Sequence, residues 1–445
     1  MHRYRSGRRP AYLGLAAIAA AALIAAGCSS SSTSSSSPGG SASPTSVQTT
    51  SGITGNQGHT SVSNYLQYVG GKAGAADNSL APVQIGYVNQ QGGSEVIGAL
   101  ATSGAQDAVN YINSELGGVD GHPIKLDTCF IASTDAEGTT CADQFLANKN
   151  IQAVATGGVV IGIQAFFSAL GGKLPVFDGV AALPVDGAQS NSVVLFGDGT
   201  HVLGPMGAYA STVLHAKTAS VIYPDDASDT PAALAIEAGL KAAGVKVTMG
   251  PFPPTATDLT GVLTAAGATT ADMVIPYTDA SECDAVAKGL VQLGITDIKK
   301  IVSAPLCLNT QVAAGFGGDF PKWTYSIASS LYGDSTDPGM PAYEAMVPKY
   351  ISAADAPDPW EIVNFGQLLT VDKILNQVGY GNLSPTSILS AGKAFTGPQA
   401  LGAPSLDCGE FSAAPGICND QAQFFEYEGH NKWVKAAGWL KPPGQ

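Results

Sequence analysis

From Pro82 to its end, the chain alternates short apolar runs with longer amphipathic stretches, and this alternation constrains the fold more than any other feature. Such regular alternation is typical of an α/β protein, in which helices cover both faces of a parallel sheet. The apolar runs predict strands at Val83–Val88, Ile124–Thr128, Ala153–Thr156, Val176–Phe177, Ala219–Tyr223, Val245–Met249, Met273–Tyr277 and Ile301–Ser303. The amphipathic stretches predict helices at Ile97–Leu116, after the Thr134–Glu137 capping box, and at Ile161–Leu170, Pro231–Ala243, Leu259–Ala266, Glu282–Leu293 and Trp360–Val378. A chain of this length is long enough for two lobes of this kind.

Residues 1–27 have the three parts of an export signal: a basic start, the apolar stretch Leu13–Ala26, and small residues after it. The apolar stretch is shorter than the roughly 20 residues that a transmembrane helix needs. Ala25–Cys28 resembles a bacterial lipobox, which implies cleavage before Cys28 and a lipid anchor on its thiol. The alternative is an ordinary signal peptide followed by a chance cysteine. The pair Arg8-Arg9 leaves the twin-arginine route open beside the general export route.

Residues 28–81 follow the signal, and serine, threonine and glycine dominate them up to Ser63. A segment of this composition buries little surface and behaves as a flexible coil. We therefore expect a tether that holds the folded part away from the membrane. Only Tyr65–Gly70 has enough apolar character to be partly ordered.

The charge balance excludes one class of partner. The 21 Lys and Arg residues against 35 Asp and Glu give a net charge of −14, and four of the arginines lie in the export signal. Affinity for phosphate backbones depends on Lys and Arg, so no nucleic-acid partner is expected. With 45% hydrophobic residues, the chain is also too apolar to be disordered throughout.

Seven cysteines are present, and Cys28 as a lipid anchor leaves six. Export to an oxidising compartment favours disulfides, although six cysteines allow about 15 pairings. The alternative is a metal site, but no CxxC, HxH or HExxH spacing occurs, and we expect no metal. The six cysteines form three sequential couples, Cys129 with Cys141, Cys283 with Cys307, and Cys408 with Cys418.

The motifs of common enzyme classes are missing or incomplete. No GxSxG occurs, and the SxxK at Ser390–Lys393 has neither SDN nor KTG beside it. Gly157, Gly158 and Gly162 match neither a GxGxxG nor a P-loop spacing, so a nucleotide cofactor is not supported. With few histidines and no acid–base constellation, the chain is expected to be no enzyme and to need no cofactor.

Several motifs follow one another in an order that points to a family. They are VQIGYVNQQG (Val83–Gly92), AVNYINSELGGVDGHPIKLDTC (Ala108–Cys129), LPVFDGVAALP (Leu174–Pro184), ASVIYPDDASDT (Ala219–Thr230), AIEAGLKAAGVKV (Ala235–Val247) and the run Thr257–Ile295. Their order and spacing resemble type I periplasmic solute-binding proteins, in particular the branched-chain amino-acid (Leu/Ile/Val) receptors of ABC importers. The resemblance covers nearly all of Pro82–Gln445.

The resemblance implies two doubly wound α/β lobes in a Venus-flytrap arrangement, joined by three hinge crossings. The crossings fall near Phe196–His201, Tyr325–Ser330 and Thr396–Pro398. The first lobe then comprises 82–198 with 329–396, and the second comprises 199–328 with 397–445. A ligand is expected between the lobes, beyond the carboxyl ends of the strands, and closure is expected to be a hinge motion.

Loops at the ends of the predicted strands supply the candidate ligand contacts. Gly158 and Gly162 let backbone amides and a helix N-terminus approach an anion, although a plain strand-to-helix turn explains them equally well. Carboxylates such as Asp178 favour a cation or an amine, whereas Asp279 also serves as the N-cap of a capping box. The candidate ligand-binding residues are Asn89, Gln90, Gly158, Gly162, Asp178, Ala182, Ser228, Asp229, Asp279 and Trp360.

The chain departs from the amino-acid receptors that it resembles. That family holds the ligand's carboxylate and ammonium with a serine, a threonine and a glutamate, whose positions here fall at residues 161–162, at Ala182 and near residues 305–306. A tyrosine of the family aligns with Ser228, whereas Trp360 matches an aromatic residue. The amino-acid pocket therefore does not carry over residue by residue. Aromatic side chains can wall an apolar pocket instead, namely Tyr87, Tyr223, Tyr277 and Trp360.

The resemblance implies a solute receptor, and the lipobox implies that it is anchored by Cys28 to the outer face of the bacterial cytoplasmic membrane. We expect it to be a monomer. It is expected to capture a small polar or amphipathic solute, such as an amino acid or a related compound. It then delivers that solute to the permease subunits of an ABC importer. The alternative is a solute sensor or a surface interaction lipoprotein on the same fold, with no role in transport.

Overall fold

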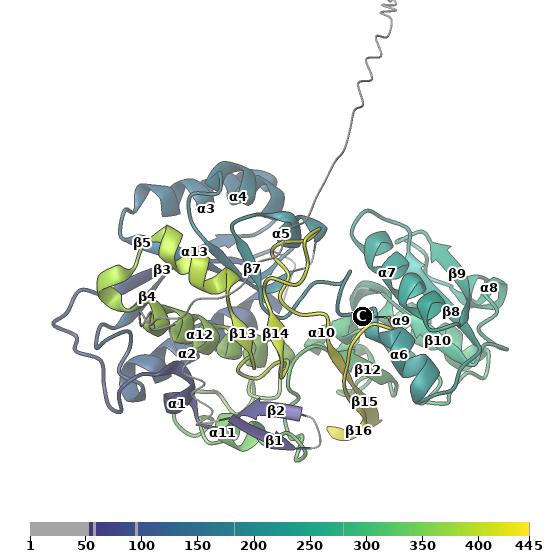
Figure 1. The fold of residues 1–445 in the computed structure, drawn as a ribbon. Helices are drawn as coiled ribbons and strands as arrows, with labels where there is room; N and C mark the ends of the chain where they lie inside the picture. Colours follow the sequence, from purple (N-terminus) through teal and green to yellow (C-terminus); the bar gives the residue numbers. More distant parts are fainter. Residues whose placement is uncertain (1–52, 57–58, 94–96, 182, 279, 445) are drawn as a thin grey trace, which may run out of the picture. The chain divides into compact units, whose positions relative to one another are not determined.

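A computed structural model describes residues 53–56, 59–93, 97–181, 183–278 and 280–444, all within the unit that spans residues 50–445 (Figure 1). Cys28, Ala182 and Asp279 lie outside the described residues. The α/β class is confirmed, because helices alternate with strands of two mainly parallel sheets.

The first lobe is built on a five-stranded sheet in which every neighbouring pair of strands is parallel. The order is β4-β3-β5-β6-β7, so the first strand of the lobe lies between the second and the third. In a sheet of this order the topological switch point lies between the first and the third strand, here β3 and β5. The strands are β3 (Val83–Gln90), β4 (Ile124–Ile131), β5 (Ile151–Val159), β6 (Val176–Ala181) and β7 (Ser192–Val194).

Helices cover both faces of this sheet, and three of them, α11, α12 and α13, come from a distant part of the chain. Helix α12 packs along α2, and at Gly104 a Cβ would lie only 2.3 Å from the backbone oxygen of Glu361. Glycine at this position therefore permits the close approach of the two helices. Within the described residues, no helix is both long and apolar enough to cross a membrane. The helices are α2 (Ile97–Glu115), α3 (Asp135–Ala147), α4 (Ile163–Leu170), α5 (Pro184–Ala188), α11 (Met340–Glu344), α12 (Pro359–Val378) and α13 (Pro385–Lys393).

The last part of the expected tether is folded, which corrects the boundary at residue 81. The hairpin of β1 (Ile53–Asn56) and β2 (His59–Val62) leads into the short helix α1 (Tyr65–Val69). The ring of Tyr68 is buried in the core of the first lobe, and its hydroxyl donates to the backbone oxygen of Pro398 at 3.0 Å. A few apolar side chains in a polar segment suffice to dock it onto a core that composition alone does not reveal.

The second lobe repeats the arrangement of the first. A parallel bridge between Val274 and Ile301 joins its two groups of strands, which gives the order β9-β8-β10-β11-β12-β15-β16 and a switch point between β8 and β10. The last two strands form a hairpin, and its first strand, β15, pairs antiparallel with β12 (Figure 1). The strands are β8 (Thr218–Pro224), β9 (Lys246–Phe252), β10 (Met273–Pro276), β11 (Val302–Ser303), β12 (Thr324–Ile327), β15 (Ala422–Gly429) and β16 (Lys432–Leu440). Its helices are α6 (Pro205–Thr212), α7 (Asp229–Ala242), α8 (Thr260–Ala265), α9 (Ala280–Gln292) and α10 (Thr310–Gly315).

The third crossing between the lobes differs from the expected position. Residues 400–418, which include the short strand β14 (Leu406–Asp407), pack into the core of the first lobe rather than the second. Strand β13 (Thr396–Gly397) pairs with β14 and therefore does not leave the first lobe. The chain crosses only at Asn419, just before β15. The extra length after β13 had no helix or strand signal that could reveal this detour.

The three crossings lie against one another. The side-chain amide of Asn419 donates to the backbone oxygen of Phe196 at 3.2 Å, which joins the third crossing to the first. The side-chain amide of Gln423 donates to the backbone oxygen of Ser329 at 2.7 Å, which joins the third to the second. These bonds tie together the segments about which the lobes would rotate.

The six cysteines of the described residues are paired in sequential couples. Their Sγ atoms are 2.01 Å apart in Cys129–Cys141, 1.97 Å in Cys283–Cys307 and 2.04 Å in Cys408–Cys418. The first links the end of β4 to α3, and the second links the start of α9 to the turn after β11. Two of the links therefore lie at the carboxyl ends of strands, one in each lobe.

Candidate functional site

The carboxyl ends of β3 and β5 meet at the switch point of the first lobe, where sheets of this order bind ligands. Asn89 lies at the end of β3 and is fully buried. Its side-chain oxygen Oδ1 accepts from the backbone N–H of Gly158 at 3.1 Å, and its side-chain nitrogen Nδ2 donates to Thr102 Oγ1 at 2.9 Å. Asn89 therefore holds the end of β5 against the first turns of α2.

Gln90 makes a second link of the same kind. Its side-chain oxygen accepts from the backbone N–H groups of Val160 at 2.9 Å and of Ile161 at 3.0 Å. The side chain is buried, so both bonds are shielded from water. The two predicted ligand contacts on β3 are thus at the predicted place, with their polar atoms engaged by the neighbouring loop.

Trp360 lies on the first turn of α12, over the end of β5. A Cβ on Gly158 would meet the indole ring at 2.5 Å, so a side chain there would displace the ring. Asp358 caps the helix by accepting from the backbone N–H of Trp360 at 2.8 Å. Gly162 is the N-cap of α4, with a φ of 78° that favours glycine.

Asp178 is the third residue of the six-residue strand β6, within the strand rather than after it as expected; it is buried and accepts from Thr156 Oγ1 at 2.7 Å. The same hydroxyl accepts from the backbone N–H of Gly179 at 3.2 Å. Thr156 is one of the partners that let the protein bury this carboxyl group.

The sequence analysis missed a cluster of acidic side chains behind Trp360. Burial raises the pKa of Glu361 to about 8, and the neighbouring carboxyl group of Asp107 adds to this shift. Burial likewise raises the pKa of Asp107 and of Asp358 to about 6, and for both the negative charge of Asp355 contributes. Asp355, Asp358 and Glu361 lie three residues apart in the sequence, and the packing of α2 against α12 brings Asp107 to them. Their spacing is local, but their burial depends on that packing.

The switch point of the second lobe carries a capping loop. Asp226 accepts from the backbone N–H groups of Ser228 and Asp229, both at 2.9 Å, and from Ser228 Oγ at 2.8 Å. Burial opposes ionisation of Asp226, but these hydrogen bonds outweigh it and lower the pKa. Asp229 is buried, whereas Asp225 is exposed at the end of β8. The exposed polar atoms at this edge thus include the carboxylate of Asp225.

A sequence model described as a periplasmic binding protein matches residues 82–415, most of the chain. The chain belongs to the periplasmic binding protein family. Its members bind solutes outside the cytoplasm and are not enzymes, as the sequence indicates for this chain. No curated protein resembles this binding protein closely enough in sequence to count as a match.

Solved structures share the fold at low sequence identity. An ABC transporter substrate-binding protein from Sphaerobacter thermophilus is 14% identical, with a TM-score of 0.67 over 81% of this chain and 98% of that chain. A leucine binding protein from Thermotoga maritima is 15% identical, with a TM-score of 0.63 over 81% and 99%. A solute binding protein of an ABC transporter from Rhodopseudomonas palustris HaA2, in complex with p-hydroxybenzoic acid, is 16% identical, with a TM-score of 0.64 over 81% and 98%.

The binding protein brings its predicted site residues to two places. Asn89, Gln90, Gly158 and Trp360 meet at the switch point of the first lobe, and Ser228 and Asp229 lie at that of the second. Gly162 and Asp178 flank the first group, on the loop before α4 and on β6. Their contact with a ligand stays a prediction, as it does for Ala182 and Asp279 outside the described residues.

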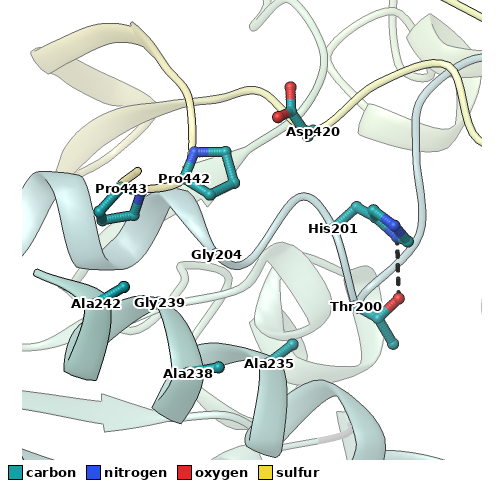
Figure 2. A pocket seen from close by; sticks show the side chains of 10 residues that line it. All are labelled: Thr200, His201, Gly204, Ala235, Ala238, Gly239, Ala242, Asp420, Pro442 and Pro443. Carbon is teal, nitrogen blue, oxygen red and sulfur yellow. Dashed lines mark hydrogen bonds between the residues drawn. The ribbon is translucent and has the colours of Figure 1, made fainter. Parts of the chain in front are cut away.

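A cavity of about 230 Å³ lies elsewhere in the binding protein, beside the first and third crossings (Figure 2). Its wall on α7 carries only small side chains, and His201 turns toward Thr200, 3.0 Å from its hydroxyl (Figure 2). None of the predicted ligand contacts lines this cavity. Within the described parts of the chain, no group of three or more His, Cys, Asp or Glu side chains is placed to hold a metal ion.

Proposed function

We propose that this protein is a lipid-anchored extracytoplasmic receptor that captures a small polar or amphipathic solute between its lobes and delivers it to an ABC permease. The observation that carries the proposal is the pair of switch points, one in each lobe, on lobes joined by three adjacent crossings. A ligand that contacts both switch points favours the closed form by its differential affinity for that form.

The neighbours in fold support a small organic solute. One is a leucine binding protein, and another holds p-hydroxybenzoic acid. The proposed contacts come from the switch point of the first lobe, with Asn89, Gln90, Gly158 and Trp360 at its centre. The contacts of the second lobe come from Ser228, Asp229 and Asp279.

A thermal-shift panel of amino acids, amides, polyamines and aromatic acids tests the capture step. A bound solute raises the unfolding midpoint in proportion to the logarithm of its concentration over Kd. Stabilisation by at least one solute, with one-to-one stoichiometry by calorimetry, is expected. No stabilisation by any member of the panel would count against a receptor.

Anchoring at Cys28 is tested by a single substitution in the full-length precursor. Cys28→Ala removes the thiol that would carry the lipid, so the mature protein is expected in the medium rather than in the membrane fraction. Ser29→Ala, which keeps the cysteine, serves as the matched control and is expected to stay with the membrane. Membrane retention of Cys28→Ala would refute the anchor.

Delivery to a permease is tested in cells. Deleting the gene is expected to abolish uptake of the identified solute at low concentration, and the wild-type gene is expected to restore it. Normal uptake without the protein would contradict a transport role. Light scattering of the mature protein is expected to give the mass of a monomer with and without the solute.

A further inference from the structure

The backbone amides at the first switch point are already occupied by side chains of the protein. Gly158 donates to Asn89 Oδ1 at 3.1 Å, and Val160 and Ile161 donate to Gln90 Oε1 at 2.9 and 3.0 Å. Free amides in the turn between a strand and the following helix are the usual means of holding a carboxylate or a phosphate. Here two side-chain oxygens stand where such an anion would accept.

The side chains that occupy these amides are held in place. Asn89 donates to Thr102, which in turn donates to Gln91 Oε1 at 2.7 Å. Asn89 and Gln90 are both buried. Displacing either by a ligand would leave buried polar atoms without partners, which costs about 1–3 kcal/mol for each group. An anionic group of a ligand therefore competes poorly with the side chains of Asn89 and Gln90 for these backbone amides.

The acidic side chains near this edge do not attract an anion either. Asp178 on β6 is buried, and Asp358 caps α12 next to Trp360. A ligand carboxylate placed here would meet carboxyl groups rather than a cation.

Three of the exposed side chains that the structure describes near this edge are apolar, beside polar ones such as Asp135 after β4. Val160 and Ile161, on the loop after β5, keep 44% and 38% of their surface exposed, and Phe130 near the end of β4 keeps 39%. The partly exposed indole ring of Trp360 covers Gly158. Ligand-binding sites are usually lined by apolar side chains, so exposed apolar side chains near a switch point are typical of a surface that contacts a ligand.

We propose that the first lobe takes an uncharged, apolar or aromatic part of the ligand, and that a cationic group of the ligand is held by the second lobe. This rests on the proposed function, because it assigns a substrate class to the same site. It excludes binding of a zwitterionic amino acid through its carboxylate and ammonium on the first lobe. Asp225, exposed at the end of β8, is a group that can face the ionic end.

Two matched ligand series separate charge from apolar contact. One keeps a branched aliphatic group in leucine, 4-methylpentanoate, 3-methylbutylamine and 4-methylpentanamide. The other keeps a phenyl group in phenylalanine, 3-phenylpropanoate, 2-phenylethylamine and 3-phenylpropanamide. Calorimetry on the mature protein measures each Kd. At least one analogue is expected to have a Kd lower by a factor of about ten or more than that of the amino acid of its series.

Substitutions at Trp360 test whether the apolar contact lies on the first lobe. Trp360→Ala is expected to weaken the best analogue by about tenfold or more, whereas Trp360→Phe keeps most of the affinity because it keeps an aromatic face. Val291→Ala, which trims an exposed apolar side chain on α9, is the matched control and is expected to change nothing. If Trp360→Ala leaves the affinity for the best analogue unchanged, the proposal is overturned.

Gln90→Ala tests the occupied amides by a gain of function. The substitution frees the N–H groups of Val160 and Ile161, so carboxylate analogues are expected to gain about tenfold over the neutral amides of the same series. Gln106→Ala, on the exposed side of α2, is the control. An unchanged preference in a variant that folds normally would overturn the proposal.

The two proposals fail in different ways. Tightest binding of leucine or phenylalanine by the wild type would overturn the inference and leave the receptor standing. No binding of either series, together with a silent solute panel, would overturn both.

Discussion

Glu361 lies on the first turn of α12, where a negative charge is ordinarily favoured by the helix dipole. Its side chain is nevertheless completely buried against α2, and this burial is the largest influence on its pKa, which it raises. We predict that Glu361→Gln, which resembles the protonated acid in shape, stabilises the protein above neutral pH and changes little at pH 5.

The sign and size follow from the pKa. The ordinary pKa of 4.5 rises to about 8 in the folded protein, so the folded state keeps a proton that the unfolded state loses between these values. The contribution of this group to stability is therefore greatest at low pH and falls as the pH rises toward about 8. At about 1.4 kcal/mol per pKa unit the loss has an upper limit of about 5 kcal/mol. Relaxation around the charge lowers this, and we expect about 3 kcal/mol.

Urea unfolding of the wild type and of Glu361→Gln at pH 5, 6, 7 and 8 measures the effect. The advantage of the variant is expected to grow with pH and to level off near pH 8. Glu344→Gln replaces an exposed glutamate of the same lobe and is expected to show no such trend. A variant no more stable than the wild type at pH 8, or an advantage that is independent of pH, would refute the reasoning.

Three further predictions follow from the packing. Gly158→Ala places a Cβ against the Trp360 ring, so it is expected to shift the tryptophan emission and to weaken ligand binding; an unchanged emission spectrum would contradict this contact. Glu137→Ala removes the acceptor of three backbone amides before α3 and is expected to cost about 1 kcal/mol by thermal unfolding, whereas no loss would argue against the cap. Replacing Cys408 and Cys418 by alanine is expected to cost about 3 kcal/mol, and the denatured, unreduced mature protein is expected to show no free thiol.

Most of the fold was predictable because its signals are local. Strands of a parallel sheet read as short apolar runs, and their helices as amphipathic stretches between them. The capping box at Thr134–Glu137 is also local, and Glu137 accepts from the backbone N–H of Thr134 at 2.9 Å. The two errors concern segments without such signals, residues 59–64 and 400–418, whereas Tyr65–Gly70 was expected to be partly ordered. Both segments contribute buried side chains to a core that is built elsewhere in the chain.

The site was predictable as a place but not as a set of contacts. The ends of β3 and β5 follow from the strand pattern, so the positions of Asn89, Gln90 and Gly158 at this edge were predictable, whereas their contact with a ligand stays a prediction. That Asn89 and Gln90 turn their oxygens onto the amides of the next loop depends on a register between strands about 70 residues apart. An asparagine and a glutamine at these positions are compatible either with contacting a ligand or with holding the backbone of the next loop.

The sequence by itself determined the α/β class of the fold and the acidity of the chain, because each is written in periodicity or composition. The two joined lobes and the solute-binding character followed from the resemblance to a family, and the sequential pairing of the cysteines was one choice among about 15. Only the tertiary structure decided where the third crossing runs, which amides are occupied, and that Glu361 shares a buried region with Asp107. These features arise between segments far apart in the chain. Their energies depend on burial and distance, which no local pattern of residues contains.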